Sequence, residues 1–143
     1  MLSRSTKYAI KAVIYLAQNS SEDHKILVRD MFQEIKVSES YLAKLLQTLS
    51  KHGMVSSSKG RGGGFYLNAD NLQHSLMDVV RVIDGNEGIE ACILGISECS
   101  ETNPCVVHHL LGPGKKAFNA ALSQTTLAQL ARDTGSSDFR FPE

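Results

Sequence analysis

The chain has 143 residues, of which 42% are hydrophobic and 21% are charged, and its formal net charge is zero. This length allows one domain with its own core and a few additional helices, and this composition excludes a wholly disordered chain. No apolar run approaches the roughly 18 residues that span a bilayer, so we expect no membrane partner.

The zero net charge conceals a division along the chain. Residues 1–67 carry ten Lys or Arg and five Asp or Glu, whereas residues 68–143 carry five and ten. A basic first half indicates a surface that binds a polyanion, and an acidic second half indicates a different task. The N-terminal segment is too broken by Lys and polar residues for a signal peptide, so we expect a cytoplasmic protein with reduced thiols.

Hydrophobic periodicity predicts three helices in the first half. Residues 6–18 place apolar side chains along one side of a helix, and a shorter amphipathic helix lies within residues 26–37. A third helix follows, with Ser38 as its N-cap and Gly53 as its terminator. Its leucines recur at i, i+3, i+4 and i+7 and define one buried stripe: Leu42, Leu45, Leu46 and Leu49.

The face of the third helix opposite the leucines carries hydrogen-bond donors and no acidic residue at its centre. The residues that cluster there are Ser40, Lys44, Gln47 and Lys51, with the small Ala43 on one flank. Two short helices joined by a tight turn, the second with such a face, are typical of a helix-turn-helix that contacts the major groove of DNA. An ordinary solvated face is the alternative for this helix taken alone.

The segment "GMVSSSKGRGGGFYL" predicts a β-hairpin with strands at residues 54–58 and 65–67. Four glycines surround Arg61 at its tip, more than a tight turn needs, and leave the arginine free to enter a minor groove. Lys59 beside it suits a phosphate contact. A helix-turn-helix followed by a basic hairpin is a winged helix, so we predict that the first half binds double-stranded DNA.

Ser75 caps a further amphipathic helix that ends at Gly85, and a polar loop follows. The candidate metal ligands of the chain lie in or beside this loop: Cys92, Cys99, Cys105, His108 and His109. The histidines follow the last cysteine by three and four residues. If Pro104 begins a helical turn, a histidine and that cysteine share one face.

Three explanations of the cysteines compete. Free surface thiols in a loop invite oxidation, which disfavours the first. Zinc accepts three cysteines and a histidine, but structural zinc sites usually space their paired cysteines two to four residues apart, unlike the wider gaps here. Iron–sulfur clusters tolerate wider and less regular spacing, so the pattern favours a cluster and leaves the two-iron and four-iron forms open.

Gly112-Pro113 indicates a helix start, because proline is favoured at the first helical position, and this helix ends near Ser123. Thr126 caps a second helix. The apolar side chains of the first suit burial against a partner chain as well as against their own domain: Ala117, Phe118, Ala121 and Leu122. Helix-turn-helix proteins generally bind two half-sites as symmetric dimers, so we expect a homodimer.

The predicted fold class is mainly α with a small β-hairpin wing, a winged helix-turn-helix followed by a C-terminal dimerisation helix. The predicted segments are a DNA-binding domain over 1–85, a cysteine-rich cluster-binding loop over 86–112, dimerisation and C-terminal helices over 113–134, and a flexible tail over 135–143.

Over essentially its whole length the chain resembles the IscR/NsrR group of bacterial winged-helix transcription regulators. The matching pieces are "KYAIKAVIYLA", "VSESYLAKLLQTLSKHGMVSSSKGRGGGFYL", "VIDG", the three-cysteine loop and "TTLAQL". The resemblance implies a repressor whose operator affinity depends on an iron–sulfur cluster. In this group the cluster senses cluster supply, nitric oxide or redox state, and a long C-terminal helix builds the homodimer.

The same resemblance implies the site residues. DNA contacts fall at Ser38, Ser40, Tyr41, Lys44, Gln47, Lys59 and Arg61. Metal ligands fall at Cys92, Cys99 and Cys105, and His108 matches the C-x-x-H fourth ligand of the IscR branch. Some members of the group take the fourth ligand from the partner chain's first helix. Residues 1–21 contain no acidic residue here, which favours His108 over a partner ligand, while His109 stays open as an alternative.

Two positions depart from the group. Ala43 stands where IscR-type proteins carry an acidic residue on the recognition helix, so the operator sequence does not transfer. Lys36 replaces a turn glycine, and we expect it to adopt another turn geometry.

We expect neither an enzyme nor a small-molecule substrate. The chain has no Ser/His/Asp pattern, phosphate loop or paired-carboxylate motif, and "GRGGGF" lacks the strand-to-helix context of a dinucleotide site. Two alternatives remain open: a metal-free regulator that senses redox state through its thiols, and a cluster-carrying protein of electron transfer or cluster assembly.

Overall fold

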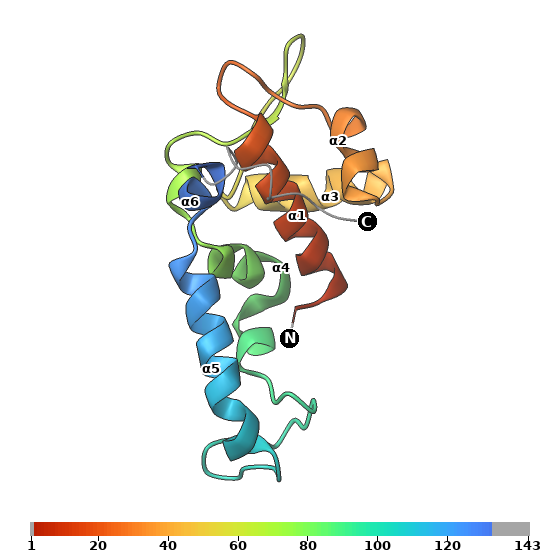
Figure 1. Cartoon of the computed structure of the whole chain (residues 1–143). Coiled ribbons are helices and arrows are strands. Elements are labelled where there is room, and N and C mark those ends of the chain that lie inside the picture. Colours follow the sequence, from red (N-terminus) through yellow and green to blue (C-terminus); the bar gives the residue numbers. More distant parts are fainter. Residues whose placement is uncertain (1, 133–143) are drawn as a thin grey trace.

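A computed structural model describes residues 2–132. The predicted tail at 135–143 lies outside the described residues. In chain order the elements are α1 (Arg4–Asn19), α2 (Val28–Ile35), α3 (Glu39–Lys51), β1 (Ser56–Ser58), β2 (Gly64–Tyr66), η1 (Asn71–Gln73), α4 (Leu76–Glu90), α5 (His108–Gln124) and α6 (Leu127–Arg132). Figure 1 shows a winged-helix unit, from which the end of α4, the cysteine loop and α5 extend as an arm. Within residues 2–132 no helix is long and apolar enough to cross a membrane.

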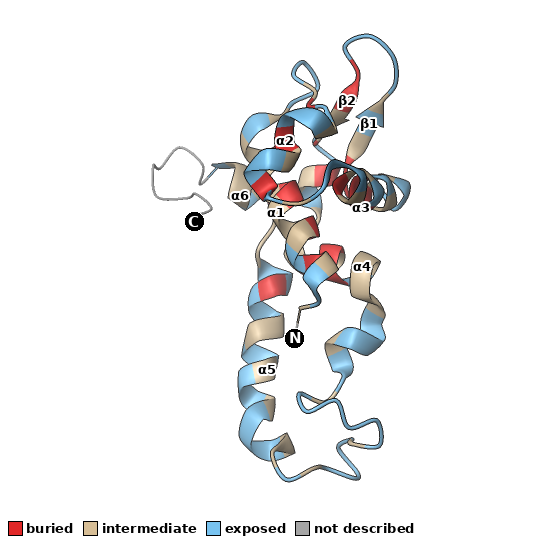
Figure 2. Cartoon of the chain, turned by 90° about the vertical axis from the view of Figure 1, so that its right-hand side faces the viewer, coloured by how far each residue is buried: buried red, intermediate tan, exposed pale blue. Residues whose placement is uncertain are grey.

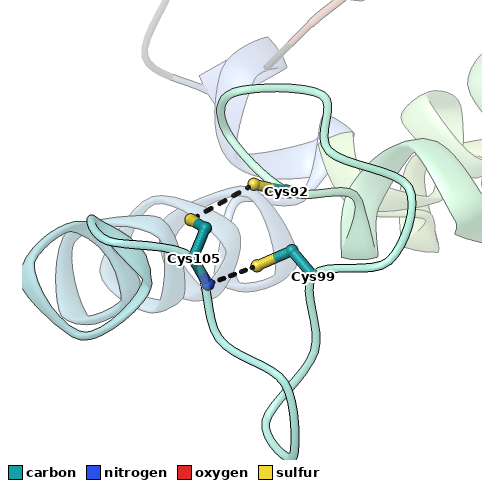
Figure 3. Close-up of side chains that lie close together, drawn as sticks. All are labelled: Cys92, Cys99 and Cys105. Atoms are coloured by element: carbon teal, nitrogen blue, oxygen red, sulfur yellow. Dashed lines mark hydrogen bonds between the residues drawn. The ribbon is translucent and has the colours of Figure 1, made fainter.

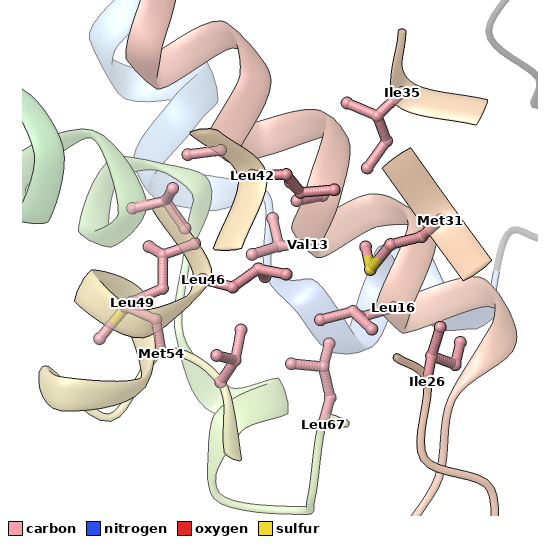
Figure 4. Close-up of a cluster of buried hydrophobic side chains, with 14 of the residues drawn as sticks. Val13, Leu16, Ile26, Met31, Ile35, Leu42, Leu46, Leu49, Met54 and Leu67 are labelled. Carbon is pink, nitrogen blue, oxygen red and sulfur yellow. The ribbon is translucent and has the colours of Figure 1, made fainter. Parts of the chain in front are cut away.

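The core lies in the winged-helix unit, where α1 packs between the other helices (Figure 4). The leucine stripe predicted for α3 is buried, which confirms the periodicity: Leu42, Leu45, Leu46 and Leu49. Val13 and Leu16 of α1 are fully buried in the same cluster. Burying each such aliphatic side chain contributes about 1.5–3 kcal/mol. Figure 2 shows that buried residues are concentrated here and are sparse along the arm.

The predicted hairpin forms, with shorter strands. β1 and β2 pair antiparallel with Ser56 opposite Tyr66 and Ser58 opposite Gly64. Met54 and Val55, which we expected in the first strand, are buried in the core instead. The second strand starts one residue earlier than expected, and Phe65 exchanges backbone hydrogen bonds with Ile26 at 2.8 and 2.9 Å, which ties the wing to the start of α2.

The turn between α2 and α3 has a left-handed backbone at Lys36, with φ 63° and ψ 52°. The N–H groups of Lys36 and Val37 both donate to the carbonyl of Phe32, at 2.9 and 3.3 Å, and close the end of α2. We expected Lys36 to avoid the turn geometry of the glycine it replaces, and that expectation is wrong. A lysine occupies the conformation that glycine takes most easily, at a cost of about 1 kcal/mol.

The helix α4 begins as predicted and extends further than predicted. Ser75 and Asp78 form a reciprocal capping box, in which the Ser75 N–H donates to Asp78 Oδ2 at 2.8 Å and the Asp78 N–H to Ser75 Oγ at 3.2 Å. At Gly85 the helix breaks, with φ 74° and ψ 171°, and residues 86–90 then resume it rather than belonging to the loop. Only glycine adopts this φ/ψ pair readily, so Gly85 sets the direction of the end of α4.

The helix α5 begins at His108, five residues earlier than predicted, and its 17 residues span about 25 Å. The His108 N–H donates to the carbonyl of Cys105 at 3.1 Å, which joins the helix to the end of the loop. Pro113 therefore lies inside the helix and leaves the carbonyl of His109 without its usual donor. Because His109 is exposed, water can satisfy that carbonyl, so the early start is tolerated.

The helix α6 returns the chain to the winged-helix unit. Thr126 Oγ1 accepts a hydrogen bond from the Gln129 N–H at 3.1 Å, which confirms the predicted cap. Leu127 is fully buried and belongs to the same core cluster as α1. The core formed by the first half of the chain thus includes a helix from its far end.

Candidate metal centre and nucleic-acid interface

The three cysteines converge at the end of the arm (Figure 3). The sulfur atoms of Cys92, Cys99 and Cys105, the thiol centre, all lie within 4.8 Å of one another. The Sγ atoms of Cys92 and Cys105 are 3.7 Å apart, and the Cys105 N–H donates to Cys99 Sγ at 3.3 Å. All three residues are half-buried.

Two local turns bring these cysteines together. After Cys92, the Gly95 N–H donates to the Cys92 carbonyl at 2.9 Å, and the φ of 75° at Gly95 suits glycine. Between Cys99 and Cys105, Ser100 and Asn103 exchange backbone hydrogen bonds at 3.1 and 3.2 Å and reverse the chain. Cysteines six and seven positions apart therefore meet at one point without help from a regular element.

His108, at the start of α5, adjoins the thiol centre. Its Nδ1 lies 3.3 Å from Cys99 Sγ, while its Nε2 lies 3.6 Å from Glu101 Oε1. A metal-binding histidine commonly directs its second ring nitrogen at a carboxylate, which fixes the tautomer and the ring. His109 packs edge-on against His108, with 5.2 Å between ring centroids, and is exposed. Glu101 was missed by sequence reasoning because only the folded loop places it beside the ring.

The thiols differ in acidity. Hydrogen bonds from the backbone N–H groups of Ile96 and Leu94 lower the pKa of Cys92 to about 7. The N–H of Cys105 favours the Cys99 thiolate, but desolvation and the two neighbouring thiols outweigh it and raise the pKa of Cys99. At neutral pH Cys92 is therefore the more readily ionised of these two thiols.

This donor set suits an iron–sulfur cluster. The thiol centre offers three sulfurs that lie close together, and His108 brings one imidazole nitrogen to within 3.3 Å of the Cys99 sulfur. Thiolates are the usual ligands of these clusters, with histidine as a substitute in some. The structure thus groups the three cysteines and places His108 beside one of them, Cys99, so the role of His108 as fourth ligand stays a prediction.

The outer face of α3 lines an open groove between α2, α3 and the wing. Ser40, Gln47 and Lys51 of α3 contribute to its lining, and Lys59 contributes from the wing. Lys44 is exposed on the same helix outside that lining. The lining also includes the acidic Glu39, so the groove gathers hydrogen-bond donors and a net positive charge between a helix and a hairpin.

The glycines at the wing tip are each required by the turn. Gly60, Gly62 and Gly64 have φ values of 83°, 75° and 144°, and a Cβ on Gly63 would lie 2.3 Å from the carbonyl oxygen of Ser58. The turn therefore accounts for the number of glycines, which we had linked to Arg61. Arg61 is exposed at the tip.

Ser38 and Tyr41 make contacts within the protein at the start of α3. The Ser38 side chain accepts a hydrogen bond from the Tyr41 N–H at 3.3 Å, as predicted for an N-cap. The Tyr41 hydroxyl lies 2.6 Å from Ser5 Oγ, and its ring packs edge-on against Tyr8 at 6.0 Å. Tyr41 therefore links α3 to α1 and is half-buried.

Arg29 is a basic residue of the groove that sequence reasoning missed. It lies in the first turn of α2 and lines the groove together with Ser57 and Ser58 of the wing. In helix-turn-helix proteins the first helix of the pair crosses the DNA backbone, and Arg29 lies in the corresponding helix of this chain. No periodic signal marks Arg29, because its neighbours in the groove are distant in the sequence.

The arrangement defines a class of protein: a winged helix-turn-helix unit of the kind that binds duplex DNA, joined to an arm that carries three thiols. Residues 2–133 match the family model of Rrf2, an iron-dependent transcriptional regulator. The chain belongs to the Rrf2 family, whose members are DNA-binding transcription regulators.

Two relatives show the extent of the likeness. A protein of Aquifex aeolicus, classed as an HTH-type transcriptional regulator, is 33% identical over 132 residues, which cover 91% of this chain and 90% of that protein. The HTH-type transcriptional regulator IscR of Yersinia pestis is 29% identical over 132 residues, which cover 92% of this chain and 79% of IscR.

Solved structures share the architecture. CymR, the global cysteine regulator of B. subtilis, matches with a TM-score of 0.74 and 26% identity over 93% of this chain and 97% of CymR. The IscR of T. potens matches with a TM-score of 0.71 and 23% identity over 99% of this chain and 93% of that IscR. This match shows that the two proteins share a fold. The predicted family and winged-helix fold are thus confirmed.

Proposed function

We propose that the protein is a transcription repressor whose operator affinity is controlled by an iron–sulfur cluster held at the thiol centre. The observation that carries the proposal is the convergence of Cys92, Cys99 and Cys105 within 4.8 Å, with His108 Nδ1 3.3 Å from Cys99 Sγ. His108 is the fourth ligand in this proposal. A bound cluster supplies a redox-active centre, whose state reports cluster supply, nitric oxide or redox conditions.

The groove between α2, α3 and the wing is the proposed DNA surface. Ser40, Lys44 and Gln47 face the major groove in this arrangement, because they are exposed on the second helix of the helix-turn-helix. Lys59 contacts phosphate, and the exposed Arg61 enters the adjacent minor groove. Ser38 and Tyr41 lie at the N-terminus of α3, where the backbone favours a phosphate.

The arm is the proposed dimer contact. One side of α5 exposes a stripe of small or apolar residues: Leu110, Pro113, Ala117 and Ala121. The Leu110 side chain is 77% exposed. A second copy packed on this stripe would bury it and would present two α3 helices to two half-sites of one operator. We propose that this homodimer acts in the cytoplasm.

A chain of contacts supports communication between the thiol centre and the DNA surface. The Ser3 N–H donates to Asp84 Oδ2 at 3.2 Å, and the Ser3 hydroxyl also bonds to Asp84, directly before the break at Gly85. From the same end of α1, Ser5 bonds to Tyr41 of α3. A cluster that binds two arrangements of the arm unequally would therefore shift the position of α3 through α4 and α1.

The decisive experiment measures iron and acid-labile sulfide after anaerobic purification and reconstitution, beside the visible absorption spectrum. We expect iron and sulfide in equal amounts, with absorption bands that Cys92→Ala abolishes and Ser97→Ala, in the same loop, retains. Zinc without sulfide would contradict the proposal. So would a colourless protein that resists reconstitution yet binds duplexes selected from a random library.

A second candidate function is thiol-based redox sensing without metal. The 3.7 Å between the sulfurs of Cys92 and Cys105 favours it, and a structure with 26% identity and a TM-score of 0.68 is the oxidised form of Staphylococcus aureus CymR. Two thiols would lose two protons and two electrons to form a disulfide while a peroxide is reduced to water. Intact-mass analysis should then show a loss of two hydrogens in metal-free protein, absent from Cys105→Ala.

A further inference from the structure

Lys115 of α5 bridges the two sides of the arm. Its ammonium Nζ donates to the carbonyl oxygen of Glu90 at 2.8 Å and to that of Ala91 at 2.7 Å. Glu90 is the last residue of α4, and Ala91 is its C-cap. Carbonyls at a helix C-terminus lack helical donors and favour a nearby cation, so this contact closes the end of α4.

The bridge holds one end of the cysteine loop directly before its first thiol. Ala91 immediately precedes Cys92, and at the other end of the loop His108 begins α5. Positions 108 and 115 are seven apart, about two turns, and so lie on the same face of α5. Both ends of the loop are thus attached to one face of a single helix, which fixes the separation of Cys92 from Cys105.

The charge at this place also matters. Residues 86–107 carry four acidic side chains and no Lys or Arg. The pocket that contains the three cysteines, His108, Glu90 and Glu101 has Lys115 as the single Lys or Arg among the described residues of its lining. Lys115 thus places the positive charge of this lining on the carbonyls directly before Cys92.

We propose that Lys115 is a positioning residue for the thiol centre: it fixes the first end of the loop so that Cys92 faces Cys99 and Cys105. The part of this inference that concerns a bound cluster rests on the proposed function. The structural part concerns the protein without metal, so the two can be tested separately.

The first test uses metal-free, reduced protein and hydrogen–deuterium exchange. Lys115→Gln removes the charge at similar length, Lys115→Arg retains charge and donors, and Lys116→Gln removes a neighbouring exposed charge. We expect the amides of Gly95 and Cys99 to exchange about ten-fold faster in Lys115→Gln, because a hydrogen bond from a charged group is lost. Lys116→Gln should match the wild type, and Lys115→Arg should restore most of the protection.

The second test measures release of the reconstituted cluster to a ferrous-iron chelator under anaerobic conditions. We expect about ten-fold faster release from Lys115→Gln and wild-type release from Lys116→Gln. Unchanged thermal unfolding of the winged-helix unit in all variants would show that the effect is local. Equal exchange in Lys115→Gln and wild type overturns the inference. A wild type that binds no cluster but shows the exchange difference overturns the proposed function and keeps the positioning role.

Discussion

Lys36 is a residue whose type conflicts with its backbone. At φ 63° the Cβ of a lysine strains the backbone, whereas glycine has no Cβ to strain it. We expect Lys36→Gly to raise the free energy of unfolding by about 0.5–1 kcal/mol, since the relieved strain exceeds the extra entropy that glycine gives the unfolded chain. Urea unfolding measures this change. Lys36→Ala keeps a Cβ, so it should give no such gain, and equal stabilisation by both variants would contradict the backbone explanation.

Single residues also show where sequence reasoning stops. Ser38 and Ser75 were predicted as caps, and both accept the expected backbone hydrogen bonds, because a cap depends on neighbours three positions away. Glu101, Arg29 and Lys115 gave no signal, because their partners belong to other elements and become neighbours only in the folded chain.

At the scale of elements, the capping box of α4 makes stability depend on pH. Desolvation would raise the pKa of Asp78, but hydrogen bonds from the backbone and side chain of Ser75, and the nearby His74, outweigh it and lower that pKa. The folded pKa therefore lies below the unfolded value of about 3.9, so the stabilisation is complete above that pH and is lost as pH falls through the folded pKa.

The prediction for α4 is tested by urea unfolding of metal-free protein over a series from about pH 6 to pH 3. The free energy of unfolding should fall with pH, and Asp78→Asn should be less stable at pH 6 and show a shallower decline. The exposed Asp70→Asn is the matched control and should follow the wild-type curve. If the free energy of unfolding of Asp78→Asn fell with pH as steeply as that of the wild type, the cap would be excluded as a source of the pH dependence.

The wing is the second element with a measurable role. We expect Arg61→Ala to lower operator affinity by about 1–3 kcal/mol and to relax an A·T preference beside the major-groove contacts. Lys59→Ala should weaken binding to all sequences alike. It should also reduce the slope of log affinity against log salt concentration by about one, the value for one lost phosphate contact. Titrations of selected and scrambled duplexes at several salt concentrations separate the two. Unchanged affinity and preference in Arg61→Ala would remove this residue from the DNA surface.

Elements were predictable to the extent that their signals are local. The stripe of Leu42, Leu45, Leu46 and Leu49 placed α3 because four apolar positions agree on one face. Gly112-Pro113 misplaced the start of α5, because a proline favoured at a first position is also tolerated where solvent satisfies the freed carbonyl. The helical residues 86–90 were missed because Gly85 is a plausible helix end, and here the Lys115 contact stabilises the segment beyond that glycine.

At the scale of the whole molecule, the fold separates its core from its thiols. The winged-helix unit contains most of the buried side chains, including Leu127 from the C-terminal helix, whereas the cysteine loop lies at the far end of an arm (Figure 2). In a regulator such a division would let the arm change its arrangement while the DNA surface stays folded. Gly85 is where α4 changes direction between the two parts.

Gly85 therefore tests the coupling. A Cβ at this position meets no atom within 4 Å, so Gly85→Ala acts through its φ of 74° and not through a clash, at a cost of about 1–3 kcal/mol.

We expect the Gly85→Ala variant to keep wild-type operator affinity without the cluster, since α3 and the wing are untouched. The ratio of affinities with and without the cluster should move toward one, because the end of α4 no longer takes the direction that ties the loop to Asp84 and α1. Duplex titrations of both forms measure this ratio, with Asn86→Ala, at an exposed position of the same segment, as the control. A wild-type ratio in Gly85→Ala would mean that the signal bypasses α4 and crosses through α5 instead.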